Sequence, residues 1–359
     1  MTEQAHTKDR GSALLQTVRD LIPSMQARAS DLDRDAAFPA ADIDALRQAG
    51  ALIAPLPERF GGLGAGTEPG GAALARELLV LCGRGNPSVA RLFEAHVNAI
   101  RLMSTYGAAD RAAADVLAGH LFGLWVTDAG APVRVEDGIL HGSKGPCSGA
   151  GHCTRAVITA EFAGATRLFL VAPSPSGPVR PVAGLHGMRA AANGVVTLDG
   201  VAGGPCFGEP GDYLREPDFS CGAWRASAAA LGALEALVEA TRTQLIARRH
   251  DRAEMQQARF GTIVIARDTA RLWVERACAA AEHPGDPAEQ VATVNLARIA
   301  VETACLDAMR AIQRSLGLAA FVAPNPVERL IRDLATYLRQ PAPDAVLTEA
   351  AAYFLRRTC

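Results

Sequence analysis

The chain has 359 residues, of which 49% are hydrophobic and 21% are charged, and its formal net charge is -2. This length allows two or three domains with a large core, and the near-neutral balance argues against nucleic acid or an anionic membrane as a partner. The N-terminal stretch MTEQAHTKDR lacks the apolar segment of a secretory signal, and no run of about 18 apolar residues predicts a membrane span.

Eight cysteines are scattered along the chain, and none belongs to a CxxC pair. This spacing argues against a zinc site, and no other metal site is expected. A chain of this length does not need disulfides to stabilise its core, so we expect reduced thiols and a cytoplasmic protein.

Helical patterns fill the first third of the chain. The segment AADIDALRQAGA places Ile43, Leu46 and Ala49 at helical spacing, and PSVARLFEAHVNAIRLMSTYG predicts a longer amphipathic helix. We therefore expect residues 1–120 to form an N-terminal helical domain.

Residues 121–212 have a different residue pattern. Four short runs rich in β-branched residues, LWVTD, RAVITAEF, RLFLVAPS and GVVTLDGV, are separated by glycine, proline, asparagine and aspartate. Such runs predict strands joined by turns. We expect a middle domain built as an antiparallel β-barrel, with a sandwich as the alternative.

Long helical patterns return in residues 213–359. Three stretches are too long for strands, AWRASAAALGALEALVEATRTQLIARR, GTIVIARDTARLWVERACAAAE and QVATVNLARIAVETACLDAMRAIQRSLG, and NPVERLIRDLATYLRQ begins a fourth helix. Long helices with short connections predict an antiparallel four-helix bundle. The order of helices, strands and bundle indicates an α+β fold, and no GxGxxG motif follows a predicted strand, which argues against a Rossmann domain.

Five segments, in order, resemble the acyl-CoA dehydrogenase family. PERFGGLG is similar to the family's Pro-Glu-x-x-Gly-Gly-x-Gly turn, LWVTDAGAP to its first flavin-facing strand, and DGILHGSKGPCSGAGHC to the following strand pair. GMRAAANGVVTLDGV is similar to its Gly-Met-Arg segment, and NPVERLIRD to Pro-x-Glu-Arg-x-x-Arg-Asp. The resemblance spans almost the whole chain. It implies FAD bound between barrel and bundle, and a homodimer or homotetramer in which a second subunit completes the site.

The resemblance also implies which residues contact the cofactor. Thr127 stands at the family's strand threonine and Ser148 at its second hydroxyl, although each residue alone would suit a strand or a turn. Arg248 stands where the family has an arginine on the FAD pyrophosphate of a neighbouring subunit. The alternative is that Arg248 is a solvated helix end and that Arg249 or Arg252 takes this role. Gln313 and Gly317 stand where a Gln-x-x-Gly-Gly loop approaches the ADP half, and Gly317 would also suit a helix C-cap.

The catalytic base that the resemblance implies has no counterpart. Most family members carry a glutamate eight residues after the aspartate of the Arg-Asp pair, and the same count from Asp333 reaches Pro341. Some relatives place the glutamate on the first bundle helix, where this chain has Gly222. Asp344 and Glu349 lie just beyond the proline-rich segment and are alternative carboxylates. The catalytic residues therefore stay unassigned.

Three functions follow from these observations. The first is an FAD-dependent oxidoreductase acting on the CH–CH group of an acyl thioester such as an acyl-CoA, with an electron-transfer flavoprotein as acceptor. The second is a flavin-dependent monooxygenase on the same fold, which needs no base for an α-proton and which the missing glutamate favours. The third is a catalytically degenerate flavin-binding or partner subunit. The fold-level resemblance alone places the first ahead.

Overall fold

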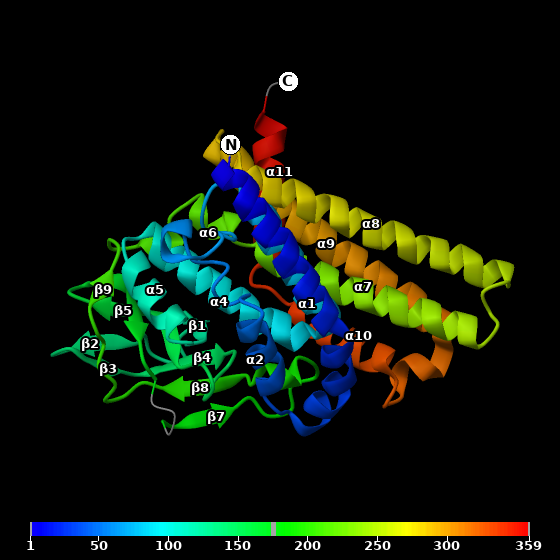
Figure 1. Ribbon diagram of the computed structural model, residues 1–359, viewed down its shortest axis with the longest axis horizontal. Coiled ribbons are helices and arrows are strands. Elements are labelled where there is room, and N and C mark those ends of the chain that lie inside the picture. Colours follow the sequence, from blue (N-terminus) through cyan, green and yellow to red (C-terminus); the bar gives the residue numbers. More distant parts are fainter. Residues whose placement is uncertain (1, 174–176, 358–359) are drawn as a thin grey trace.

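The computed structural model describes residues 2–173 and 177–357. Figure 1 shows a region of strands on one side of the molecule, long helices on the other, and the N-terminal helices between and across them. Within the described residues, no helix has both the length and the apolar character needed to cross a bilayer.

Within the described residues, five α-helices precede the first strand: α1 (Thr2–Asp35), α2 (Ala40–Gln48), α3 (Ala72–Gly85), α4 (Pro87–Thr105) and α5 (Ala109–Leu117). Helix α4 forms one wall of the candidate site. The side chain of Asn86 caps it by accepting a hydrogen bond from the Ser88 amide at 3.0 Å, and Pro87 occupies the first turn. Phe93 and Val97 lie on its buried apolar face.

The strands that the described part of the chain forms next are β1 (Phe122–Trp125), β2 (Arg134–Glu136), β3 (Ile139–His141), β4 (Ser143–Cys147), β5 (Arg155–Phe162), β6 (Ala165–Val171), β7 (Val179–Pro181), β8 (Gly194–Thr197) and β9 (Cys206–Phe207). The larger sheet has the order β3-β2-β5-β6-β9, with β1 paired to β5. The smaller sheet has the order β4-β8-β7.

The predicted antiparallel barrel is not confirmed. In the described residues the strands form two separate sheets, and the larger sheet is mixed because β1 and β2 both run parallel to β5. The hairpin neighbours β5 and β6 are antiparallel, as expected for strands joined by a tight turn. Alternating hydrophobicity specifies which face of a strand is buried, but it does not specify which strand lies beside it.

The second half of the chain is helical: α6 (Asp218–Cys221), α7 (Trp224–Ala247), α8 (Glu254–Glu282), α9 (Pro287–Leu316), α10 (Pro326–Tyr337) and α11 (Pro343–Arg356). Helices α7, α8 and α9 lie side by side (Figure 1), α10 packs on α7, and α11 packs on α9. The helical N- and C-terminal regions of the predicted α+β fold are confirmed. The division of the chain into domains at residues 120 and 212 stays a prediction.

Helices α3 and α7 approach closely because each has a glycine at the contact. A Cβ atom on Gly232 would lie 2.1 Å from the carbonyl oxygen of Val80, and one on Gly83 would lie 2.4 Å from that of Ala229. No larger side chain fits without moving the backbone. This contact joins the N-terminal helices to the bundle and brings α4 and α7 to opposite sides of one cavity.

Helix α4 is tied to strand β1 by the buried side chain of His96. Its Nε2 atom lies 2.8 Å from the carbonyl oxygen of Leu52, and its Nδ1 atom accepts a hydrogen bond from the Phe122 amide at 3.2 Å. Burial lowers the pKa of His96 to about 4, so the ring is neutral near pH 7. The neutral tautomer satisfies both bonds, which makes His96 a structural residue.

Helix α10 is held by buried ion pairs. Asp333 accepts hydrogen bonds from the Arg329 guanidinium at 2.9 Å and from the Met188 amide at 2.7 Å. Burial raises the pKa of Asp333, and these two partners oppose that rise. Arg332 pairs instead with Asp33 of α1 at 2.6 Å. The adjacent residues Arg332 and Asp333 are therefore both structural, and each forms its ion pair with a different partner.

Candidate functional site

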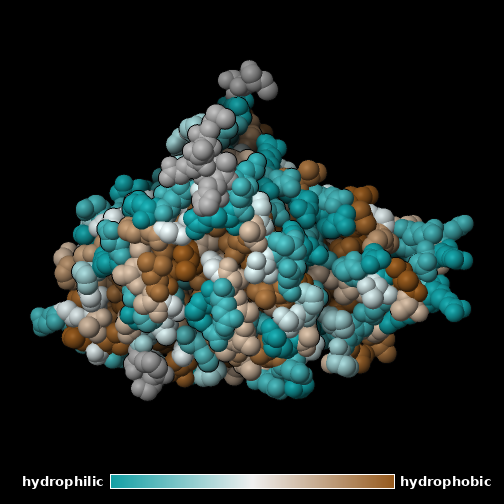
Figure 2. All heavy atoms as spheres, in the orientation of Figure 1, coloured by the Kyte–Doolittle hydropathy of each residue, from teal (hydrophilic) through white to brown (hydrophobic). Residues whose placement is uncertain are grey.

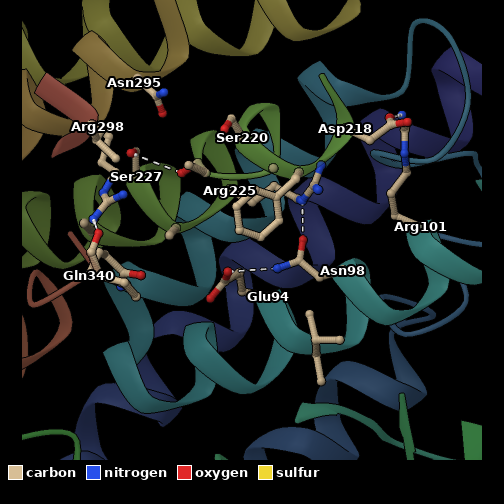
Figure 3. Close-up of a pocket in the computed structure, with 18 of the residues that line it drawn as sticks. Glu94, Asn98, Arg101, Asp218, Ser220, Arg225, Ser227, Asn295, Arg298 and Gln340 are labelled. Carbon is tan, nitrogen blue, oxygen red and sulfur yellow. Dashed lines mark hydrogen bonds and ion pairs between the residues drawn. The ribbon is translucent and has the colours of Figure 1, made fainter. Parts of the chain in front are cut away.

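A cavity of about 390 Å³ opens between α4, the start of α7, the middle of α9 and the segment that follows α10. Its walls are largely apolar, with a smaller number of polar side chains facing inward (Figure 3). The apolar part includes Leu102, Leu124, Phe219, Ala226, Val301 and Leu338. A pocket with apolar walls and a few placed polar groups is the usual form of a small-molecule site.

Both positions at which the sequence places a missing base line this cavity. Gly222 lies just before α7, and Pro341 lies in the segment between α10 and α11. The two positions are far apart in the sequence and meet at one site. Neither residue has a group that can take a proton, so the cavity lacks a base at both of them.

Glu94 of α4 is a buried carboxylate in the cavity wall. One oxygen accepts from the Asn98 amide at 2.9 Å, and the other accepts from the Arg91 guanidinium at 2.6 Å and the Tyr337 hydroxyl at 2.9 Å. Burial and the nearby charge of Glu94 raise the pKa of Tyr337 well above its usual value, so Tyr337 stays protonated and donates. Three donors hold the carboxylate in place, which suits a structural role better than proton transfer.

Two other carboxylates line the cavity, and both are paired with arginines. Asp218 of α6 accepts from Arg101 at 3.0 Å, and Glu302 of α9 is bonded to Arg339. Asp218 lies four residues before Gly222 in the sequence, and the structure places it in the cavity lining. Asp344, an alternative base by sequence, is exposed at the start of α11 and does not line the cavity.

Glu349, the other alternative carboxylate, is exposed on the next turns of α11 and also lies outside the cavity lining. Within the described residues, every carboxylate of the cavity wall is therefore hydrogen-bonded to an arginine.

A pattern in the sequence of α4 indicates this polar wall. Arg91, Glu94, Asn98 and Arg101 are spaced by three, four and three residues, which places them on one face of α4. The rest of that helix is predominantly apolar and buried. A polar stripe on a buried helix indicates a site, because unpaired polar groups are costly in a core.

The residues predicted to contact the flavin ring lie near the strands. Thr127 follows β1 and is exposed, and within the described chain its hydroxyl has no hydrogen-bond partner. Ser148 follows β4 and is buried, with its hydroxyl donating to Asn193 at 2.9 Å and accepting from Arg91 at 3.2 Å. The indole of Trp125 donates to the Ser148 carbonyl at 2.9 Å.

Arg248, Gln313 and Gly317 lie together at the opposite end of the molecule, where α7 and α9 finish. The Arg248 guanidinium reaches the carbonyl of Leu316 at 3.5 Å and the Gln244 amide oxygen at 3.2 Å. The tip beside it, between α7 and α8, is strongly hydrophilic (Figure 2). The far ends of α7 and α9 lie on the other side of the molecule from the strands (Figure 1).

These groups fit a flavin dinucleotide in part. Thr127 offers a free hydroxyl, and Arg248 is exposed and forms no ion pair with a carboxylate in the described residues, which suits a phosphate group. The Ser148 hydroxyl could donate a hydrogen bond to a flavin only if it gave up the one that it donates to Asn193. The five cofactor assignments stay predictions.

Comparison with known proteins places the chain in a family. Residues 8–114 match the sequence profile described as acyl-CoA dehydrogenase, N-terminal domain, and residues 223–339 match that described as acyl-CoA dehydrogenase, C-terminal domain. Together these matches span more than half of the chain. The chain belongs to the acyl-CoA dehydrogenase family. A comparison with curated protein sequences gave no match.

Solved structures of similar fold include both dehydrogenases and monooxygenases. Butyryl-CoA dehydrogenase from Megasphaera elsdenii is 16% identical, with a TM-score of 0.82 over 97% of this chain and 98% of that chain. Dibenzothiophene monooxygenase TdsC from Paenibacillus sp. A11-2 is 19% identical, with a TM-score of 0.80 over 95% and 97%. Methanesulfinate monooxygenase MsuC from Pseudomonas fluorescens is 21% identical, with a TM-score of 0.79 over 96% and 97%. At these identities the likeness establishes the fold alone.

Proposed function

We propose that this chain is a flavin-dependent monooxygenase that acts on a compact substrate in the cavity between α4, α7 and α9. One observation carries the proposal. The two positions for a dehydrogenation base, Gly222 and Pro341, face the cavity without a titratable group, while the carboxylates in its wall are bound by arginines.

Dehydrogenation and monooxygenation require different catalytic groups from the protein. Dehydrogenation of an acyl thioester requires a free base beside the α-carbon, and loss of such a base typically costs about 10²–10⁴-fold in rate. Monooxygenation requires no α-proton base: one atom of O₂ enters the substrate and the other leaves as water, with two protons and two electrons that the bound flavin supplies. The chain's part is to bind and orient the substrate and to exclude bulk water.

The cofactor is proposed to be FAD shared between two copies of the chain. Thr127 and Ser148 would approach the ring, and Arg248, Gln313 and Gly317 of a second copy would approach the pyrophosphate and ADP. The separation of these two groups supports a homodimer or homotetramer (Figure 1). The TdsC structure solved with FMN and indole supports a flavin in this fold.

A CH–CH dehydrogenase that passes electrons to an electron-transfer flavoprotein is the second candidate. One observation favours it: Asp218 lines the cavity four residues before Gly222 and is only partly buried. If Arg101 released it, Asp218 could serve as a base. Glutaryl-CoA dehydrogenase, solved with glutaryl-CoA and 22% identical with a TM-score of 0.83, supports this candidate at the level of fold.

Isotope labelling tests the proposal. The full chain, FAD, NADH and a separate flavin reductase are incubated under isotopically labelled dioxygen with a panel of small aromatic and aliphatic acids, sulfinates and amines. We expect a product that carries one labelled oxygen atom and forms only when the chain is present. If no substrate in the panel gains label, the proposed monooxygenation is contradicted. If the chain also fails to take up flavin, the dehydrogenase alternative is contradicted as well.

A further inference from the structure

Two arginines of the cavity wall, Arg298 and Arg225, have no carboxylate partner within the described residues. Arg298 donates to the Pro341 carbonyl, whereas the terminal nitrogens of Arg225 make no hydrogen bond. Arg225 lies in the first turn of α7 and is 7% exposed. Its Nε atom donates to the Asn98 side chain, and within the described residues its two terminal nitrogens have neither a hydrogen-bond nor an ion-pair partner. By contrast, Arg91 is paired with Glu94, and Arg101 with Asp218.

A buried guanidinium without a counter-ion is energetically unfavourable. Burial, together with the charge of Arg101, lowers the pKa of Arg225 to about 10, so the group is still cationic near pH 7. Glu94 and Asp218 oppose this shift through space, but neither is hydrogen-bonded to Arg225, since Glu94 accepts from Arg91 and Asp218 accepts from Arg101. The protein alone therefore leaves a positive charge facing the cavity with two free donor nitrogens (Figure 3).

A second polar group in the same cavity is also without a partner. Asn295 of α9 is 4% exposed and lines the cavity, and its side-chain amide makes no hydrogen bond within the part of the chain described. Buried amides are nearly always hydrogen-bonded, so an unbonded one at a cavity indicates a missing ligand group. Asn295 comes from the helix that faces α4 across the cavity, and it points inward from that side (Figure 3).

We propose that Arg225 binds an anionic head group, a carboxylate or a related oxyanion, of a compact substrate whose apolar body fills the rest of the cavity, and that Asn295 hydrogen-bonds to the same molecule. A guanidinium with two free nitrogens matches a two-oxygen anion in a bidentate arrangement. The apolar side chains of Leu102, Phe219 and Val301 suit the body of such a molecule. The inference rests on the proposed function only in taking this cavity as the place where the substrate binds.

Calorimetric titration of the full chain tests this inference without any turnover. The probes are phenylacetate, octanoate and benzenesulfinate, with phenylacetamide and octanamide as neutral counterparts. We expect the anions to bind more tightly than the amides. Replacing Arg225 with glutamine should weaken anion binding about 10- to 100-fold, the range for hydrogen bonds to charged groups, and leave the amides nearly unchanged.

Two further variants make the result specific. Arg225→Lys keeps the positive charge but cannot donate from two nitrogens in parallel, so it should bind the anions with intermediate affinity. This variant also serves as the test if Arg225→Gln does not fold. Arg310→Gln removes an exposed arginine from α9 and should change anion affinity by less than about twofold, because surface charges are screened.

The inference is overturned if no anion binds to the wild-type chain, if anions and amides bind equally, or if Arg225→Gln and Arg225→Lys bind the anions as tightly as the wild type does. These outcomes are separate from those of the isotope experiment. Labelled products from neutral substrates alone would support monooxygenation and contradict the role of Arg225. Anion binding without labelled product would support Arg225 and leave monooxygenation contradicted.

Discussion

Replacing Asp333 with alanine is expected to lower the free energy of unfolding by about 3–5 kcal/mol, the range for breaking a buried ion pair. The substitution leaves the Arg329 guanidinium buried without its counter-ion, and the Met188 amide loses its acceptor. Both partners are in the interior, where an unpaired group cannot turn to water. Urea unfolding followed by circular dichroism at neutral pH measures the change.

Two further variants show whether the loss of stability in Asp333→Ala comes from the broken ion pair or from mutation in general. Asp307→Ala removes an exposed carboxylate that lies 3.6 Å from Arg310, and it should change stability by less than about 0.5 kcal/mol. The double variant Arg329→Met with Asp333→Leu removes both charges and should recover much of the loss, because neither charge is left unpaired. Equal stability of Asp333→Ala and the wild type would contradict the account of how α10 is held.

Glu94→Gln is expected to cost about 2–3 kcal/mol of stability, because a neutral amide cannot match the charge of Arg91 and can accept at only one atom. The matched control is Glu302→Gln, which changes another carboxylate of the same cavity. Its partner Arg339 is 57% exposed and can be solvated, so the cost should be below about 1 kcal/mol. Urea unfolding of the two variants measures the difference.

A larger effect at Glu302 than at Glu94 would contradict the view that Glu94 is the centre of the buried polar wall. A Tyr337→Phe variant adds an independent check, because it removes one of the three donors and leaves the charge pair intact. Its cost should fall below that of Glu94→Gln, at about 1–2 kcal/mol for one buried hydrogen bond to a charged group.

Helices were predictable from the sequence because their signals are local. The apolar spacing of Ile43 and Leu46 falls within α2, and the segment that begins at Pro87 forms α4. The pairing of strands was not predictable in the same way. The run LWVTD indicates a strand, but nothing within it specifies that β1 lies parallel to β5 rather than beside its nearest neighbour in sequence.

The site was only partly predictable for a related reason. Counting along the chain located Gly222 and Pro341, and the structure brings both to one cavity. The charged wall opposite them comes from α4, which lies more than a hundred residues earlier and whose apolar spacing alone predicts an ordinary amphipathic helix. Arg225 is hydrogen-bonded to Asn98 and has no carboxylate partner within the described residues, and this arrangement depends on tertiary contacts that no sequence pattern indicates.

The most direct measurement of the central claim is anaerobic mixing of the flavin-loaded chain with acyl-CoA thioesters of increasing length, followed by the visible absorbance of the flavin. The account predicts no bleaching with any thioester, because neither Gly222 nor Pro341 can take the α-proton and the carboxylates of the cavity wall are held by arginines. Rapid and complete bleaching by one of these thioesters would contradict it, and would identify the chain as a dehydrogenase with a base other than those two positions.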